Sequence, residues 1–126
     1  MASNDTVTWS QVPMGGKLLL TNTGGSLGIV TATVNYVPAD APESPNQLSE
    51  GAVDGTQTYT LEEGLYTVNW LIAATTNDDG LSGAAGFSAQ VMNPDGTTNG
   101  TTVTVSCTKS SGGTSNESGL LNIEVF

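Results

Sequence analysis

The sequence contains no histidine and no arginine, and its only cysteine is Cys107. Without histidine, the chain cannot form the Ser-His or Cys-His pairs of nucleophilic enzymes. It also lacks the commonest protein ligand for zinc and iron. A single cysteine excludes a disulfide within the chain. We therefore expect a protein that is not an enzyme, has no catalytic residues and uses no cofactor.

Positive charge is almost absent, because Lys17 and Lys109 are the only basic residues beside twelve Asp and Glu. Proteins that bind nucleic acid or anionic lipid place several Lys or Arg against phosphates. A chain with a net charge of −10 cannot do so. We expect no nucleic-acid partner.

Long apolar runs are also missing, and no segment approaches the roughly 18 apolar residues of a membrane-spanning helix. We therefore expect no insertion into a membrane. The first residues, Met-Ala-Ser-Asn-Asp, lack the basic and apolar regions of a signal peptide. We expect synthesis in the cytoplasm, from which the protein could still reach a virion or an extracellular surface.

The residues that are abundant favour β-structure. Gly, Ser, Thr and Asn make up 57 of the 126 residues. Thr suits a pleated, half-buried strand, whereas Gly, Asn and Ser favour turns. The spacing of apolar residues and turn signals predicts about eight short strands in one all-β domain, residues 1–126, folded as an antiparallel β-sandwich or jelly roll.

Alternation of apolar and polar residues is clearest in Gly28–Val37 and Leu65–Ala74, which we expect to be central strands. Three prolines between residues 38 and 45 predict a long surface loop over Pro38–Asp54. We expect Thr56–Leu61 to form a hairpin with Leu65–Ala74, and Ser110–Gly119 to be a second polar loop. The expected core contains these residues: Val30, Val34, Val68, Trp70, Ile72, Val103, Val105 and Ile123.

Candidate binding residues come from two aromatics and two acidic loops. Trp9 and Tyr59 are aromatics that alternation does not assign to a core face. Each could stack on a sugar ring among Asn, Asp and Thr, or could equally cover an end of the sandwich. Asp and Asn in flexible loops can also hold calcium, although these residue types equally serve turn chemistry. The candidate binding residues are Trp9, Tyr59, Asn77, Asp78, Asp79, Asp95 and Asn99, of which Asp78, Asp79 and Asp95 are weak candidates for calcium.

Two short segments resemble parts of known families. Leu61–Val68 is similar to a hairpin of many β-sandwich adhesion and carbohydrate-binding modules. Asn116–Gly119, followed by an alternating strand, resembles the C-terminus of the calcium-dependent galactose-binding bacterial lectins. However, Lys109 falls where the calcium loop of those lectins carries an acidic residue, which argues against a metal there.

These observations leave two hypotheses for function. The first is a structural protein that self-associates as a homo-oligomer or joins other structural proteins, such as a virion decoration (capsid cement) or an appendage subunit. Because copies of such an acidic chain repel one another, the contact should use neutral surface, and we expect the termini and residues 38–54 to lie in it. The second is a lectin-like carbohydrate-binding module, whose partner is a glycan.

Overall fold

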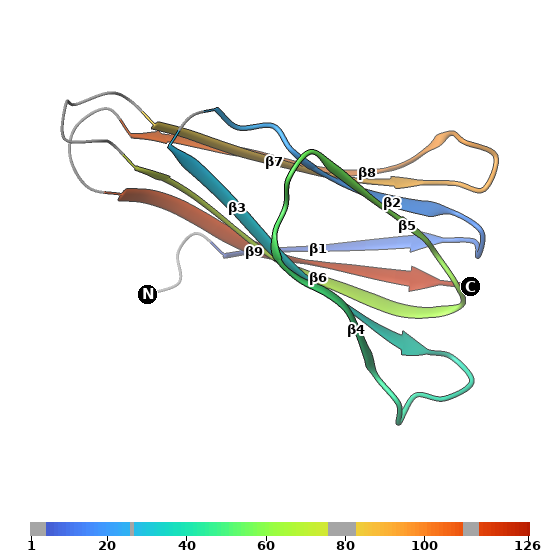
Figure 1. The fold of residues 1–126 in the computed structure, drawn as a ribbon. Coiled ribbons are helices and arrows are strands. Elements are labelled where there is room, and N and C mark those ends of the chain that lie inside the picture. The colour runs from blue at the N-terminus through green and yellow to red at the C-terminus, as the bar shows by residue number, and fades with distance from the viewer. Residues whose placement is uncertain (1–4, 26, 76–82, 110–113) are drawn as a thin grey trace.

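The computed structural model of this protein describes residues 5–25, 27–75, 83–109 and 114–126, and the regular secondary structure in these ranges consists of β-strands alone. The described residues form nine strands in two stacked sheets (Figure 1), so the prediction of an all-β sandwich is confirmed. The described residues contain no helix of the length and apolarity needed to cross a membrane. The strands are β1 Asp5–Val12, β2 Lys17–Asn22, β3 Gly28–Pro38, β4 Asn46–Ala52, β5 Thr56–Thr60, β6 Gly64–Thr75, β7 Gly83–Met92, β8 Thr98–Lys109 and β9 Thr114–Val125.

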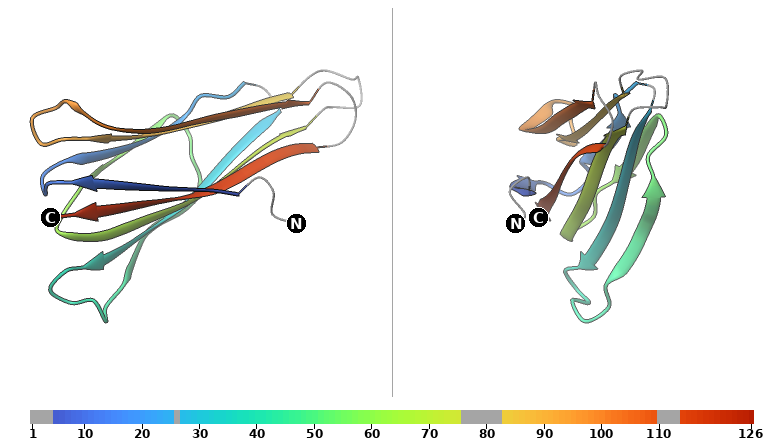
Figure 2. Two further views of the ribbon diagram at one scale, coloured as in Figure 1. Left: turned by 180° about the vertical axis from the view of Figure 1, so that it is seen from behind. Right: turned by 90° about the vertical axis from the view of Figure 1, so that its left-hand side faces the viewer.

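One sheet has five strands in the order β1-β9-β6-β3-β4, and the other has four in the order β5-β2-β7-β8. All neighbouring strands are antiparallel except β1 and β9, which run parallel from the pair Asp5–Ser118 to the pair Val12–Val125. The first and last strands of the chain therefore lie side by side at one edge of the five-stranded sheet (Figure 2).

The core lies between the two sheets. It is built by every second residue along the strands, whose side chains point inward. Trp70 of β6 stacks on Phe87 of β7, with ring centroids 5.6 Å apart, and so joins the two layers. All the core residues expected from the sequence pack there, with Val105 half-buried and the other seven buried. β6 is the middle strand of its sheet and β3 lies beside it, as alternation predicts.

The predicted hairpin between Thr56–Leu61 and Leu65–Ala74 is wrong, because β5 and β6 belong to different sheets. The chain turns a corner between them at Gly64, whose φ of +143° is a conformation that favours glycine. The hydroxyl of Tyr66 accepts a 2.9 Å hydrogen bond from the backbone N–H of Glu62 and closes this corner. A tyrosine bonded in this way is a feature of corners in immunoglobulin-like sandwiches.

Two predicted loops also contain strands. Pro38–Asp54 includes β4, which pairs with β3 through a bulge near Asn35. β4 is an exposed edge strand with little apolar alternation, which explains why the sequence pattern did not indicate it. The polar segment before Leu120 belongs to β9, because residues 114–119 pair with β6.

Candidate binding face of the five-stranded sheet

The outer face of the five-stranded sheet exposes large apolar side chains. Alternate residues of a strand point to opposite faces, so the residues between the core positions of β1, β9, β6 and β3 point outward. Among them Trp9, Val7, Ile29 and Leu71 are 63%, 61%, 57% and 44% exposed. Contiguous apolar surface of this kind marks an interaction site more often than a scatter of single residues does.

Four of these outward residues form a diagonal stripe across the sheet. Val7 of β1 is the register partner of Leu120 on β9. On β6, the register partner of Leu120 is Asn69, and Leu71 is the next residue after Asn69 that points to the same face. On β3, the register partner of Leu71 is Thr31, and Ile29 is the neighbouring residue on the same face, in the same diagonal direction. Diagonal neighbours on one face are within reach of long side chains, so Val7, Leu120, Leu71 and Ile29, here called the apolar stripe, cross four strands.

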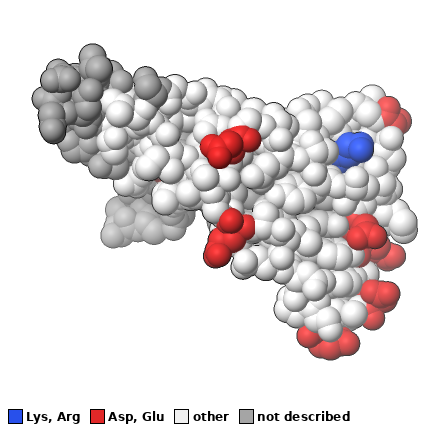
Figure 3. All heavy atoms as spheres, in the orientation of Figure 1, with Lys and Arg blue, Asp and Glu red and all other residues white. Residues whose placement is uncertain are grey.

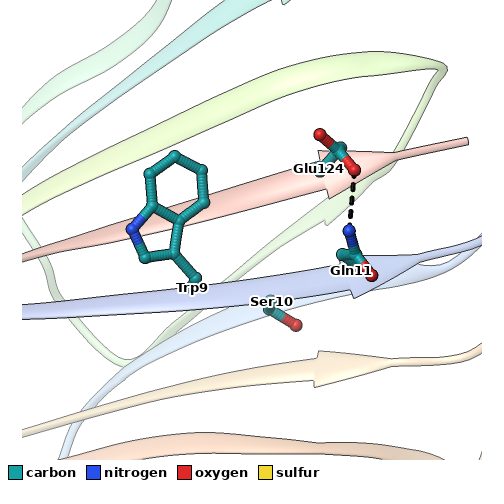
Figure 4. Close-up of a pocket in the computed structure, with 4 residues that line it drawn as sticks. All are labelled: Trp9, Ser10, Gln11 and Glu124. Atoms are coloured by element: carbon teal, nitrogen blue, oxygen red, sulfur yellow. Dashed lines mark hydrogen bonds between the residues drawn. The ribbon is translucent and has the colours of Figure 1, made fainter.

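Beside the stripe runs a row of neutral polar residues. Trp9 is the register partner of Asn122, which pairs with Thr67, which in turn pairs with Asn35. Asn122 is buried although it points outward. Figure 4 shows the Trp9 indole lying across β9. Amide and hydroxyl groups on the sheet next to an exposed indole can donate and accept hydrogen bonds without adding charge.

The end of the face beyond Trp9 is hollowed. Gln11 and Glu124 are register partners, and the Gln11 Nε2 donates a 2.8 Å hydrogen bond to the Glu124 Oε1. A hollow of about 480 Å³ is lined by Trp9, Ser10, Gln11 and Glu124 (Figure 4). A second hollow of about 500 Å³ also includes Trp9 and Glu124 in its lining and extends over Val37, Pro38, Pro42, Leu65 and Phe126. The two hollows adjoin at Trp9 and Glu124, and together they are here called the Trp9 groove.

The outer face of the four-stranded sheet is different. Its outward residues on β5 are Thr56, Thr58 and Thr60, and its largest outward apolar side chains, Leu19 and Met92, are half-buried. Among the described residues, none of the exposed large apolar side chains belongs to β2, β5, β7 or β8. The two outer faces of the sandwich therefore differ in exposed apolar surface, and the outer face of the five-stranded sheet is the more apolar one.

Several of the described acidic side chains lie at one end of the sandwich. Figure 3 shows them around the end that carries the β3–β4 connection. Asp40, Glu62 and Glu63 line a hollow there together with Tyr36, whose hydroxyl donates a 2.6 Å hydrogen bond to the carbonyl of Glu63. Burial, followed by the nearby Tyr66 and these acids, raises the pKa of Tyr36. A second copy of the chain would be repelled from this end.

The structure separates the candidate binding residues inferred from the sequence. Trp9 lies on the outer face of β1, whereas Tyr59 is half-buried against the core, and its hydroxyl lies 2.6 Å from the Ser49 hydroxyl. Asn99 is engaged within the fold, since its Oδ1 accepts from the Ser10 hydroxyl at 2.9 Å and its Nδ2 donates to Asn93. Asn77, Asp78 and Asp79 lie outside the described residues.

Asp95 is the calcium candidate that lies within the described residues, and its carboxylate is engaged in a turn. Asp95 accepts hydrogen bonds from the hydroxyl and the backbone N–H of Thr97, which lower the pKa of its carboxyl. It serves the turn between β7 and β8, as Asp does in many turns. Within the ranges that the structure describes, no three Cys, Asp or Glu lie close enough together to hold a metal ion. Cys107 is half-buried against the core.

Sequence reasoning did not find Gln11 and Glu124. The signal for Gln11 was present, because it shares the face of Trp9 at a spacing of two residues. Its meeting with Glu124 depends on the parallel pairing of the first and last strands, which no local pattern encodes.

Comparison with known proteins gives no relative. No protein family model, no curated protein and no solved structure matches this chain.

Proposed function

We propose that this protein is a non-enzymatic structural subunit that self-associates through the outer face of its five-stranded sheet, as in a virion decoration (capsid cement) or an appendage. The observation that carries the proposal is the apolar stripe of Val7, Leu120, Leu71 and Ile29. Three of its four side chains are more than two-fifths exposed, and burying each fully against a partner is worth about 1–2 kcal/mol.

Charge dictates where copies can meet. Each copy has a net charge of −10, and repulsion between copies is screened over about 8 Å at physiological salt. Attraction must therefore come from neutral surface with apolar contact at its centre. On the outer face of the five-stranded sheet the described acidic side chains are Glu50, on the edge strand β4, and Glu124, which Gln11 bonds. Both lie away from the stripe, as polar rims lie around interface cores.

The geometry suits a symmetric contact. Two twisted sheets can pack face to face about 10 Å apart, with their strand directions within roughly 30° of each other. Two copies related by a two-fold axis would cross their stripes on such a face, and a self-complementary patch of this kind is the commonest basis of homo-oligomers. β1 and β9 provide half of the stripe, so the terminal strands lie in the proposed contact, whereas the loop of residues 39–45 belongs to the acidic end.

The test is sedimentation velocity and light scattering over ranges of protein and salt concentration. We expect the mass of the wild-type protein to rise above 12.8 kDa with concentration, and more so at higher salt. The double substitution Ile29→Thr and Leu71→Thr should keep the protein monomeric. The matched control is Leu19→Thr on the outer face of the four-stranded sheet, which should assemble as the wild type does. A wild-type protein that stays monomeric, or a double variant that assembles equally well, would contradict the proposal.

A further inference from the structure

The Trp9 groove has features that self-association through the apolar stripe does not use. Trp9, Gln11 and Glu124 lie beyond the stripe, toward the end of β1 and β9. The indole is the most exposed large apolar side chain among the described residues, and it lies beside a hydrogen-bonded amide and carboxylate. Trp side chains are enriched among the residues that contribute most to binding energy at interfaces.

We propose that the Trp9 groove binds a neutral sugar. One ring stacks its apolar C–H face on the Trp9 indole, and its hydroxyls bond to Gln11 and Glu124. The face of an indole is large, rigid and electron-rich, and it attracts the weakly positive C–H groups of a ring laid on it. This inference does not depend on self-association of the protein.

The polar partners are hydrogen-bonded to each other. Gln11 and Glu124 face outward from neighbouring strands and are joined by a 2.8 Å hydrogen bond. A carboxylate accepts roughly four hydrogen bonds and an amide nitrogen donates two. The Gln11–Glu124 bond uses one of each, so the pair retains the capacity to accept and donate toward adjacent hydroxyls of a sugar. A site on rigid strands loses less entropy on binding than one on a loop.

The second hollow gives the site length. Pro38, Pro42, Leu65 and Phe126 line it, and it adjoins the first hollow at Trp9 and Glu124. Each hollow has a volume within the usual range for ligand pockets, roughly 300–1,000 Å³. The neighbouring hollow could therefore receive a second ring of an oligosaccharide, and we expect a disaccharide to bind more tightly than a single sugar.

Charge defines the class of sugar. Glu124 lines both hollows, Glu63 lines the second, and the whole chain has a net charge of −10. Sialic acids, uronic acids and sulfated sugars would bring a like charge to this carboxylate, which is unfavourable. The groove should therefore prefer neutral hexoses and N-acetylhexosamines over acidic glycans.

The test is a glycan array that carries neutral and acidic glycans, followed by fluorescence titration with methyl-β-glucoside, methyl-β-galactoside and N-acetylglucosamine. Trp9 is exposed whereas Trp70 is only 3% exposed. A sugar in the groove should therefore shift the long-wavelength emission of Trp9 and leave that of Trp70 unchanged. We expect signal from neutral glycans only, and a loss of affinity of about tenfold or more in Trp9→Ala.

Two further variants separate this site from the proposed self-association. Glu124→Gln should weaken binding and reduce the discrimination against acidic glycans. The Ile29→Thr and Leu71→Thr variant should bind sugar as the wild type does, because its substitutions lie outside the groove. An array without neutral-glycan signal, a preference for acidic glycans, or a Trp9→Ala protein with wild-type binding would overturn the inference, whatever the state of assembly.

Discussion

The hydroxyl of Tyr66 accepts a 2.9 Å hydrogen bond from the backbone N–H of Glu62, four residues earlier in the chain. This bond satisfies a backbone donor at the point where the chain leaves one sheet for the other. Tyr66 is buried, and its ring stacks on Tyr36 with centroids 4.4 Å apart. Tyr66 therefore joins the backbone of the corner at Glu62 to the ring of Tyr36, which lies at the acidic end of the sandwich.

Replacing Tyr66 by Phe tests the energetic weight of this corner. The change removes the acceptor and keeps the buried ring, so we expect the free energy of unfolding to fall by about 1–2 kcal/mol in urea titration. Tyr36→Phe is the matched control, because its hydroxyl bonds to a carbonyl at an exposed position. It should cost about 0.5 kcal/mol or less. Equal losses in the two variants would contradict a special role for the corner.

Gly64 should tolerate no side chain. Its φ is +143°, and a Cβ there would meet the carbonyl oxygen of Val37 and the ring of Tyr36. We expect Gly64→Ala to destabilise the fold by at least about 2 kcal/mol, measured by thermal or urea unfolding. Gly55, with a φ of +68° and open space around it, separates the two causes. Gly55→Ala should cost only the conformational part, about 1 kcal/mol.

Alkaline pH should weaken the fold through Tyr66. Burial disfavours the phenolate and raises the pKa of Tyr66 above its ordinary value of 10.0. The unfolded chain then loses its proton at lower pH than the folded chain, so this contribution is fully present below pH 10 and is lost as pH rises through the higher folded pKa. Urea midpoints should fall in that range, and less steeply in Tyr66→Phe. Parallel curves for the two proteins would refute the assignment.

The edge strand β1 should depend on one side-chain bridge to the opposite sheet. The buried Ser10 hydroxyl donates to Asn99 of β8 at 2.9 Å. We expect a double-mutant cycle of Ser10→Ala and Asn99→Ala to give a coupling energy of about 1 kcal/mol. Hydrogen exchange of the β1 amides should accelerate in either single variant. Additive losses with unchanged β1 exchange would show that the bridge does not hold the strand.

The sequence predicted the elements in which burial imposes alternation. β3 and β6 each place one residue in two against the core, and their bounds and inward residues follow from that pattern. β4 has no buried residue, so it leaves no such signal, and only its pairing with β3 reveals it. The polar half of β9 was not predicted for a related reason. It is built of polar residues such as Thr, Ser, Asn and Glu, and its pairing with β6 makes it a strand.

The candidate site was predictable only in part. Alternation did not assign Trp9 to a core face, which made it a candidate for an exposed aromatic. Trp9 is exposed in the structure. The same argument misplaced Tyr59, because the pairing of β5 with β2 turns that side chain toward the core beside Leu18. The neighbours of Trp9 come from β9 and from the end of β3, more than 25 residues away in sequence. Long-range pairing of this kind cannot be read from local spacing.

The most direct test of the proposed assembly face is the concentration dependence of backbone amide resonances. If copies meet through the apolar stripe, the shifts with rising protein concentration should map to the outward residues of β1, β9, β6 and β3, around Val7, Leu120, Leu71 and Ile29. They should be absent in the variant with Ile29→Thr and Leu71→Thr. Shifts that map to β5, β2, β7 and β8, or no concentration dependence at all, would contradict the account.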